Sequence, residues 1–120
     1  MKTKVLNIAL TAACAVGLSA CGSGPKSLYY WGDYTENVYE RLKDNGKPVG
    51  EQIDKMEKYF QKASNNQQSA APGAYAHMGL LLIDAGQNQQ ALAQFEKEKQ
   101  LFPESGSFMD FLLKNAKGEK

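Results

Sequence analysis

The most specific chemistry in this sequence belongs to the thiol of Cys21, which ends the run Leu-Ser-Ala-Cys at residues 18–21. Lys2 and Lys4 precede an apolar run over residues 5–17. A basic start, a short apolar run and small residues before a cleavage point are typical of a secretory signal peptide, and the run is short for a membrane-spanning helix. The cysteine makes the tetrapeptide a lipobox. We therefore expect diacylglyceryl transfer to the thiol, cleavage before Cys21, and acylation of the new amine, for example with palmitate.

Two alternatives exist for this segment. It can be an ordinary cleaved signal peptide with a cysteine present by chance, or Cys14 can be the lipidated residue. Cys14 is disfavoured because residues 11–13 contain no leucine and leave too short an apolar region before it. The favoured interpretation gives a signal peptide over residues 1–20, a lipidated cysteine and tether over residues 21–27, and a folded domain over residues 28–120.

The mature chain has the size of one small domain. Loss of Lys2 and Lys4 changes the formal net charge from +1 to −1, so there is no basic surplus that would favour nucleic acid. Cys14 leaves with the signal peptide and Cys21 is acylated, which leaves no thiol for a disulfide, a metal or nucleophilic catalysis. We expect no cofactor, no metal and no nucleic-acid partner.

The residues around Cys21 also predict a location. Two or three acyl chains make a stable anchor, since each buried methylene contributes roughly 0.8 kcal/mol. An aspartate after the cysteine would favour the inner membrane of a Gram-negative cell, so Gly22 favours the outer membrane in such a host. The polar tether over residues 22–26 reaches about 17 Å when extended, at roughly 3.3–3.6 Å per residue. The domain is therefore expected to face the periplasm close to the bilayer.

Helical periodicity and end signals predict an all-α domain with about five helices. The first spans residues 34–44, with Asp33 and Glu36 at capping-box spacing. The others span about residues 50–63, 72–85 and 88–102, and a last one starts at Ser105 or Ser107. Gly86 is expected to end one helix and Asn88 to cap the next. The expected apolar faces are Val38, Tyr39 and Leu42; Ile53, Met56, Phe60 and Ala63; Tyr75, Met78, Gly79, Leu82 and Ile83; Ala91, Leu92, Phe95 and Leu101; and Phe108, Met109, Phe111, Leu112 and Leu113.

Residues 72–105 match the 34-residue period of a tetratricopeptide repeat (TPR) and are the best single repeat in the chain. Gly79 and Ala91 would let two antiparallel helices approach closely, while Tyr75 and Phe95 would fill the space beside them. A generic helical hairpin is the alternative. The helices over residues 34–63 do not repeat this pattern, so we expect a degenerate hairpin there and a C-terminal helix that caps the array.

Several segments carry a resemblance to a known family. They are the aromatic stretch at residues 28–34, the helix at 39–43, the segments at 76–81 and 95–99, and the block from Leu101 to Leu113 with Phe-Pro-Glu-Ser and Phe-Met-Asp-Phe-Leu-Leu. Together with the lipobox, they resemble the small bacterial lipoproteins of domain of unknown function 4810. That family has no assigned activity. Its members are often encoded beside a curli-secretion-channel-like (CsgG-type) lipoprotein, so the resemblance implies such a lipoprotein as a partner in an envelope complex.

Polar residues give little indication of catalysis. His77 is the only histidine and has no cysteine or second histidine to form a site with, so we expect it on a helix surface or lining a groove. The run Glu-Lys-Glu-Lys at residues 96–99 is expected to be a solvated face, with pairs that contribute roughly 0.2–0.5 kcal/mol each. Contact between Lys97 or Lys99 and a partner is the alternative. Glu98 stands where TPR motifs usually have a small residue, which predicts looser packing there.

Aromatic side chains are the better candidates for partner contacts, because Tyr and Trp are typical interface anchors. The block at residues 29–34 is expected to complete the core; it can otherwise dock a partner or rest among lipid headgroups near the anchor. The last helix is apolar on more than one face, so part of it should stay exposed. The partner-binding candidates are Tyr30, Trp31, Tyr75 and Phe108.

These observations predict a non-enzymatic, outer-membrane lipoprotein that acts as a protein-binding adaptor. A regulator of peptidoglycan synthesis is the alternative within the same class. An enzyme is the least favoured, because nothing in the sequence indicates a pocket that holds paired carboxylates.

Overall fold

The fold consists almost entirely of helices. The computed structural model describes residues 2–5, 7, 24–44 and 46–118, so Cys21 and most of the predicted signal peptide lie outside the described residues. The predicted all-α class is confirmed, with two very short strands added. Between residues 24 and 118 the elements are β1 (Tyr29–Tyr30), α2 (Tyr34–Lys43), α3 (Val49–Asn65), β2 (Ser69–Ala70), α4 (Ala74–Asp84), α5 (Asn88–Leu101), the 3-10 helix η2 (Pro103–Ser105) and α6 (Gly106–Ala116).

The chain folds as two units with the same order of strand, turn, helix and helix. Strands β1 and β2 pair in parallel, with Tyr29 opposite Ser69 and Tyr30 opposite Ala70. In each unit the helix begins four residues after the end of its strand, at Tyr34 and at Ala74. Equivalent positions are thus 40 residues apart, as Tyr29 and Ser69 are. This spacing explains why the first half does not repeat the 34-residue pattern.

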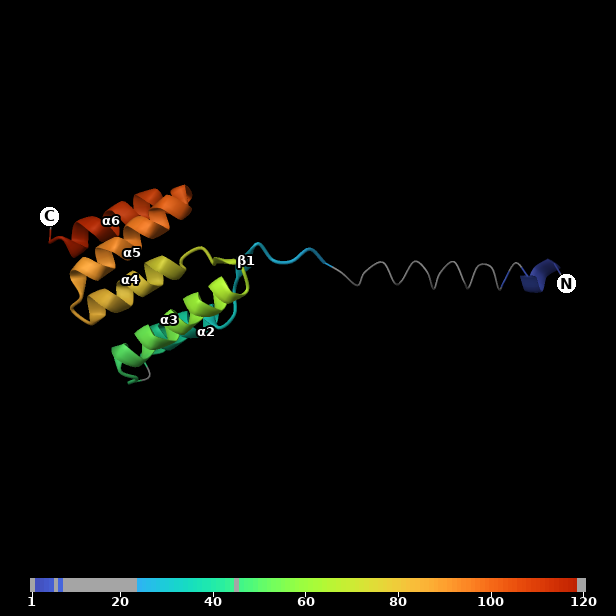
Figure 1. Ribbon diagram of the computed structural model, residues 1–120, viewed down its shortest axis with the longest axis horizontal. Coiled ribbons are helices and arrows are strands. Elements are labelled where there is room, and N and C mark those ends of the chain that lie inside the picture. The colour runs from blue at the N-terminus through green and yellow to red at the C-terminus, as the bar shows by residue number, and fades with distance from the viewer. Residues whose placement is uncertain (1, 6, 8–23, 45, 119–120) are drawn as a thin grey trace.

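Helix α4 occupies the centre of the molecule. It packs against α3 on one side and α5 on the other, while α2 lies on α3 and α6 lies on α5 (Figure 1). Its buried residues lie on every side of the helix, as expected for a helix enclosed by its neighbours. They include Ala76, Met78, Leu81 and Leu82.

The contact between α4 and α5 is close because Gly79 has no side chain. A Cβ atom at Gly79 would lie 2.3 Å from Cε1 of Phe95, whose ring rests directly on the glycine. Phe95 and Ala91 are both buried on α5. The structure therefore confirms the small-against-large packing that the sequence predicts for this hairpin.

Tyr59 ties the strand pair to α3. Its hydroxyl donates to the carbonyl oxygen of Tyr30 at 2.5 Å and accepts from the amide of Ala71 at 2.8 Å. The side chain is fully buried, although Tyr59 is not among the apolar residues that helical spacing predicts for this face. One hydroxyl thus satisfies a buried donor on the β2 side and an acceptor on the β1 side.

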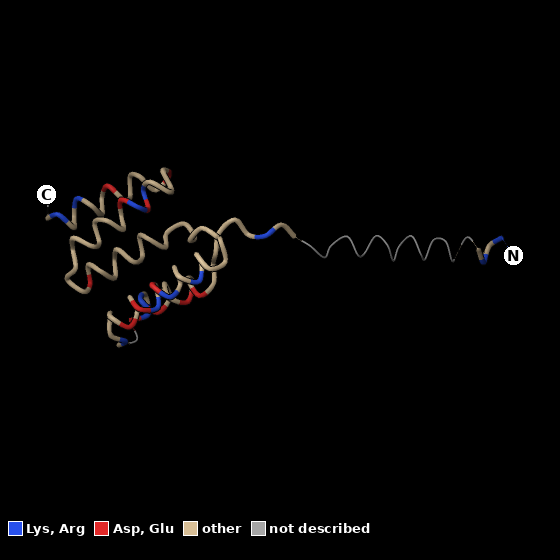
Figure 2. Tube along the Cα trace, viewed as in Figure 1, with Lys and Arg blue, Asp and Glu red and all other residues tan. Residues whose placement is uncertain are grey.

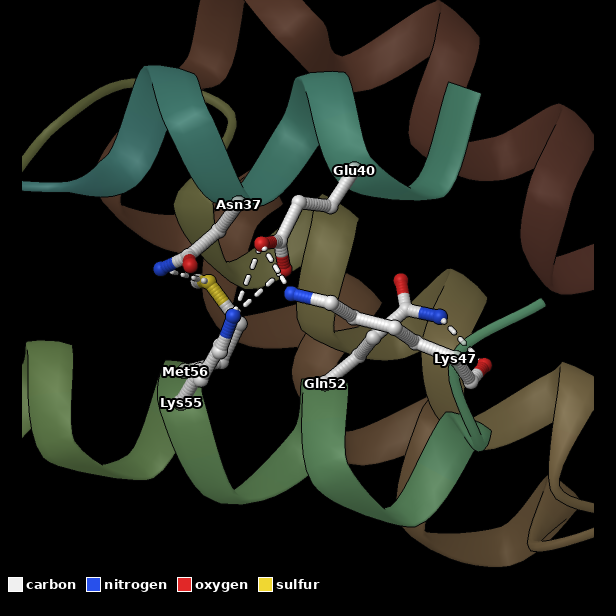
Figure 3. Close-up of polar contacts among 6 residues, drawn as sticks. All are labelled: Asn37, Glu40, Lys47, Gln52, Lys55 and Met56. Atoms are coloured by element: carbon white, nitrogen blue, oxygen red, sulfur yellow. Dashed lines mark hydrogen bonds and ion pairs between the residues drawn. The ribbon is translucent and has the colours of Figure 1, made fainter. Parts of the chain in front are cut away.

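Helix α2 turns a polar side inward, which corrects the predicted apolar face. Figure 3 shows the carboxylate of Glu40 between α2 and α3, where it accepts from Lys47 at 2.7 Å and from Lys55 at 2.7 and 2.8 Å. Hydrogen bonds from Lys47 and Lys55 lower the pKa of Glu40 below its ordinary value. Tyr39 and Leu42, expected to face the core, are 60% and 72% exposed.

Two more polar contacts hold α2 in this orientation. The Asn37 amide lies 3.7 Å from the sulfur of Met56 on α3, a contact also drawn in Figure 3. Arg41 makes two hydrogen bonds with Asp84 on α4, at 2.8 and 3.3 Å. Val38 is only half-buried. Helix α2 is therefore held by polar side chains at least as much as by apolar burial.

Three helix-end predictions are wrong and one is confirmed. Asp33 makes no capping hydrogen bond and instead accepts from Lys62 at 3.2 Å. Asn88 is the first residue of α5 rather than its cap, and α4 begins at Ala74, two residues after the predicted proline start. Gly86 has a φ of +75°, the left-handed conformation expected of a glycine that ends a helix.

Candidate functional site

A groove runs over α4 between α3 and α5. Its centre is the stack of Phe60 from α3 on Tyr75 from α4, whose ring centroids are 4.6 Å apart with an angle of 16° between the planes. The ammonium of Lys97 on α5 lies 4.4 Å from the Tyr75 ring centroid, a cation–π distance. The site therefore combines an aromatic floor with one positive charge.

Three hollows make up the groove. One of about 310 Å³ lies beside β2, and a neighbour of about 350 Å³ shares Phe60, Tyr75 and Lys97 with it. A third, of about 400 Å³, continues toward the start of α5 and shares Glu57, Met78 and Gln94 with the second. We call this continuous surface the α3–α5 groove. Its lining residues are Ile53, Glu57, Phe60, Gln61, Ala63, Ser64, Gln68, Ser69, Ala70, Tyr75, Met78, Leu82, Gln87, Gln90, Ala93, Gln94, Lys97 and Leu101.

Side-chain amides dominate the polar part of the groove. Gln61 and Gln68 lie on the α3 side, and Gln87, Gln90 and Gln94 lie on α5 or just before it. Figure 2 shows charged positions crowded on α2 and α3 and sparse on α4 and the first half of α5. Amides can donate to and accept from peptide groups. The groove therefore has a chemistry suited to an extended polypeptide.

Glu98 lies beside this floor and is fully buried, which corrects the prediction of a solvated face with loose packing. One carboxylate oxygen accepts from the amide of Gly73 at 2.6 Å, at the start of α4. Burial raises the pKa of Glu98, and the amides of Gly73, Ala76 and Tyr75 oppose part of that rise. Glu98 thus caps α4 from another helix and fixes the turn that carries Tyr75.

Residues 28–112 match the model of the family described as Domain of unknown function (DUF4810). The chain belongs to this family. No curated protein and no solved structure shows a match to it. The DUF4810 match starts one residue before β1 and ends inside α6, so it contains the whole α3–α5 groove and leaves Cys21 outside.

His77 of this DUF4810 domain is buried on the side of α4 that contacts Tyr34 of α2, not on a surface or in the groove. Its ring centroid lies 6.3 Å from that of Tyr34, with the planes close to perpendicular. Burial, and to a smaller extent the charge of Arg41, lowers the pKa of His77 to about 4, while Asp84 opposes this. Burial also raises the pKa of Tyr34 to about 12, with a further contribution from Glu98.

The buried His77 predicts a loss of stability in mild acid. The pKa is about 4 in the folded chain and near 6.5 in the unfolded chain, so unfolding takes up a proton between these values. The free energy of unfolding should therefore fall by about 2 kcal/mol between pH 7 and pH 4.5 on this account. Denaturant titrations at both pH values, on the wild type and His77→Phe, measure the effect. Equal pH dependence in the two proteins would contradict it.

The four partner-binding candidates of this DUF4810 domain lie in different environments. Tyr30 is half-buried and its ring packs on Tyr59 at a centroid distance of 5.5 Å, so it belongs to the core. Trp31 is 48% exposed beside Tyr34, and Phe108 is 55% exposed on α6. Tyr75 alone lies in the groove. Cys21, the predicted lipidation site, lies outside the described residues.

Most of the groove is not apparent from the sequence. Helical spacing predicts Phe60 and Met78 as core residues, where they do pack in part, and Lys97 as one member of a solvated charged run, with partner contact as the alternative. The repeated glutamines on α5 were a usable signal, because neutral amides on an exposed helix are less common than charges. Among the residues that the structure describes, no cluster of histidine, cysteine and carboxylate side chains could hold a metal ion, and no helix has the length and apolarity of a membrane span.

Proposed function

We propose that this DUF4810 protein is a membrane-anchored adaptor that binds an extended segment of a protein partner in the α3–α5 groove. The observation that carries the proposal is the Phe60–Tyr75 stack with Lys97 above it, flanked by hollows lined with amides. Aromatic anchors with few charges around them are typical of the centre of a protein interface. A TPR-like origin of the α4–α5 hairpin is part of the proposal and is supported by the Gly79–Phe95 packing.

The anchor is the second part of the proposal. The lipobox that ends at Cys21 supports lipidation, and Gly22 supports the outer membrane with the domain facing the periplasm. The tether is short, so the groove would be held near the bilayer. Lipid and groove would act together: the lipid sets the place and the groove selects the partner.

The proposed partner is a CsgG-type lipoprotein of the same envelope complex, as the family resemblance implies. A photo-crosslinking residue at Gln94, inside the groove, tests this in the native envelope. Gln89 also lies on α5 but does not line the groove, so it is the matched control. We expect an adduct with a channel-like subunit from Gln94 and none from Gln89.

A second substitution tests the chemistry of the groove. Lys97→Glu reverses the only positive charge among the groove residues, and because the side chain is exposed we expect the fold to tolerate the change. We expect at least about a tenfold loss of the Gln94 adduct, the effect of roughly 1.4 kcal/mol. An adduct with a peptidoglycan synthase in place of the channel-like subunit would favour the alternative function. Equal adducts from Gln94 and Gln89 would contradict the groove.

The anchor has its own test. Cys21→Ala should abolish acyl labelling and release the protein from the outer-membrane fraction. Retention of label and of outer-membrane fractionation in this variant would overturn the lipobox assignment.

A further inference from the structure

Helix α6 keeps two large aromatic side chains in solvent. Met109 and Leu113 are buried against α5, but Phe108 and Phe111 are 55% and 59% exposed. A helix that closes a repeat array normally has a polar outer face, because nothing covers it. The outer face of α6 therefore has the composition of a contact surface.

A hollow lies along one flank of this surface. It measures about 220 Å³ and opens between α4, α5 and α6. Its lining is almost entirely apolar, with one amide. The residues are Leu80, Ile83, Phe95, Leu112, Asn115 and Ala116. An aromatic side chain from a docked helix would find apolar contacts there.

The charged residues of α6 can pair with the same residues of a second copy of the helix. Asp110 and Lys114 are four residues apart, one helical turn, on the same flank of the helix, and both are exposed. When two α6 helices lie antiparallel about a twofold axis, Asp110 of each faces Lys114 of the other. In this register the twofold axis passes beside Leu112, so the Phe111 residues of the two copies are offset by two positions, about 3 Å along the helix at roughly 1.5 Å per residue. Phe108 then lies opposite Ala116, at the edge of the hollow.

We propose that α6 is the interface between two copies of this chain, packed antiparallel about a twofold axis. The charge pattern favours a second copy over another protein, because a twofold interface uses the same surface from both sides. Lys99 already pairs with Asp110 at 2.5 Å, and an exposed carboxylate has free lone pairs for Lys114 of the second copy. The proposal is independent of the α3–α5 groove and of the lipid anchor.

Cysteine crosslinking of the full-length protein in whole cells tests the interface. At a twofold axis Phe111 lies near its own copy, so Phe111→Cys should give a covalent dimer with a short bismaleimide. Tyr39→Cys is the control, since Tyr39 is an aromatic residue on a helix and is equally exposed. The native cysteines are common to both variants. Equal dimer yields from the two variants would overturn the proposal.

A charge swap distinguishes a specific dimer from crosslinking caused by random collisions. In the Phe111→Cys background, Lys114→Asp places like charges across the interface, and we expect about a tenfold loss of dimer. Adding Asp110→Lys should restore the yield by exchanging the two signs. The helical circular dichroism of each variant confirms that the chain is folded. No loss with Lys114→Asp, or no recovery in the swapped protein, would rule out the antiparallel register.

Discussion

Replacing Gly79 with alanine should destabilise the protein by about 2–3 kcal/mol, the upper part of the roughly 1–3 kcal/mol typical when a packed core is overfilled. The new Cβ would lie 2.3 Å from Cε1 of Phe95 and 2.7 Å from its Cδ1. The Phe95 ring is buried and cannot swing into solvent. Helices α4 and α5 would therefore have to separate. Denaturant unfolding of the full-length chain, followed by circular dichroism, measures the loss.

Gly50→Ala is the matched control for this substitution. Gly50 also lies in a helix, α3, but a Cβ there meets nothing within 4 Å. The same chemical change should stabilise that site by about 0.4–1 kcal/mol, because alanine loses less backbone entropy on folding. Phe95→Leu combined with Gly79→Ala should recover part of the loss, since the two positions share one contact. Equal stability of Gly79→Ala and the wild type would disprove the close helix contact.

The contact between Gly79 and Phe95 could be predicted because it depends on local spacing. Small and large residues at fixed positions of a 34-residue unit determine how two neighbouring helices meet. Helix α2 shows the limit of such arguments. Its apolar residues Tyr39 and Leu42 share a face, yet that face points to solvent, because Glu40 finds two lysines on the inner side. Helical periodicity identifies which residues share a face of a helix, but not whether that face packs against another helix or points to solvent.

The strand pair and the groove depend on residues that are far apart in sequence. Each strand has only two residues, so neither shows an alternating pattern. The hydroxyl of Tyr59 joins both segments, and nothing near Tyr59 in the sequence indicates this. Phe60 and Tyr75 come from different helices and stack only because α3 packs against α4. Such sites follow from tertiary packing, which a single sequence does not specify.

Glu98 was open to prediction, since it follows Ala91 and Phe95 at helical spacing and precedes the buried Phe102 by four residues. A carboxylate on the helix face that these residues form must either be buried with them or interrupt that face. The charged neighbours at 96, 97 and 99 instead favoured a solvated face. The amides at the start of α4, which make burial possible, belong to another helix.

Glu98→Ala should have the second large effect, a loss of about 3 kcal/mol. The half-buried amide of Gly73 would lose its acceptor, a loss worth about 1–3 kcal/mol, and the missing side chain would leave a cavity. The first turn of α4 would loosen, and Tyr75 with it. We therefore expect the Gln94 photo-adduct to fall together with stability. A fully stable Glu98→Ala protein would contradict the capping role.

Glu98→Gln separates capping from charge. The glutamine keeps an acceptor oxygen for Gly73 in nearly the same volume but cannot ionise. Since burial raises the pKa of Glu98, the folded wild type keeps this proton to a higher pH than the unfolded chain, which releases it around the ordinary value of 4.5. The contribution of Glu98 to the free energy of unfolding is complete below that pH and is lost as the pH rises through the pKa of the folded state. This pH dependence is opposite in sign to that of His77. The stability of Glu98→Gln relative to the wild type should therefore increase between pH 5 and pH 8 in denaturant titrations. A decrease would mean that the positive end of the α4 dipole outweighs burial and holds Glu98 ionised.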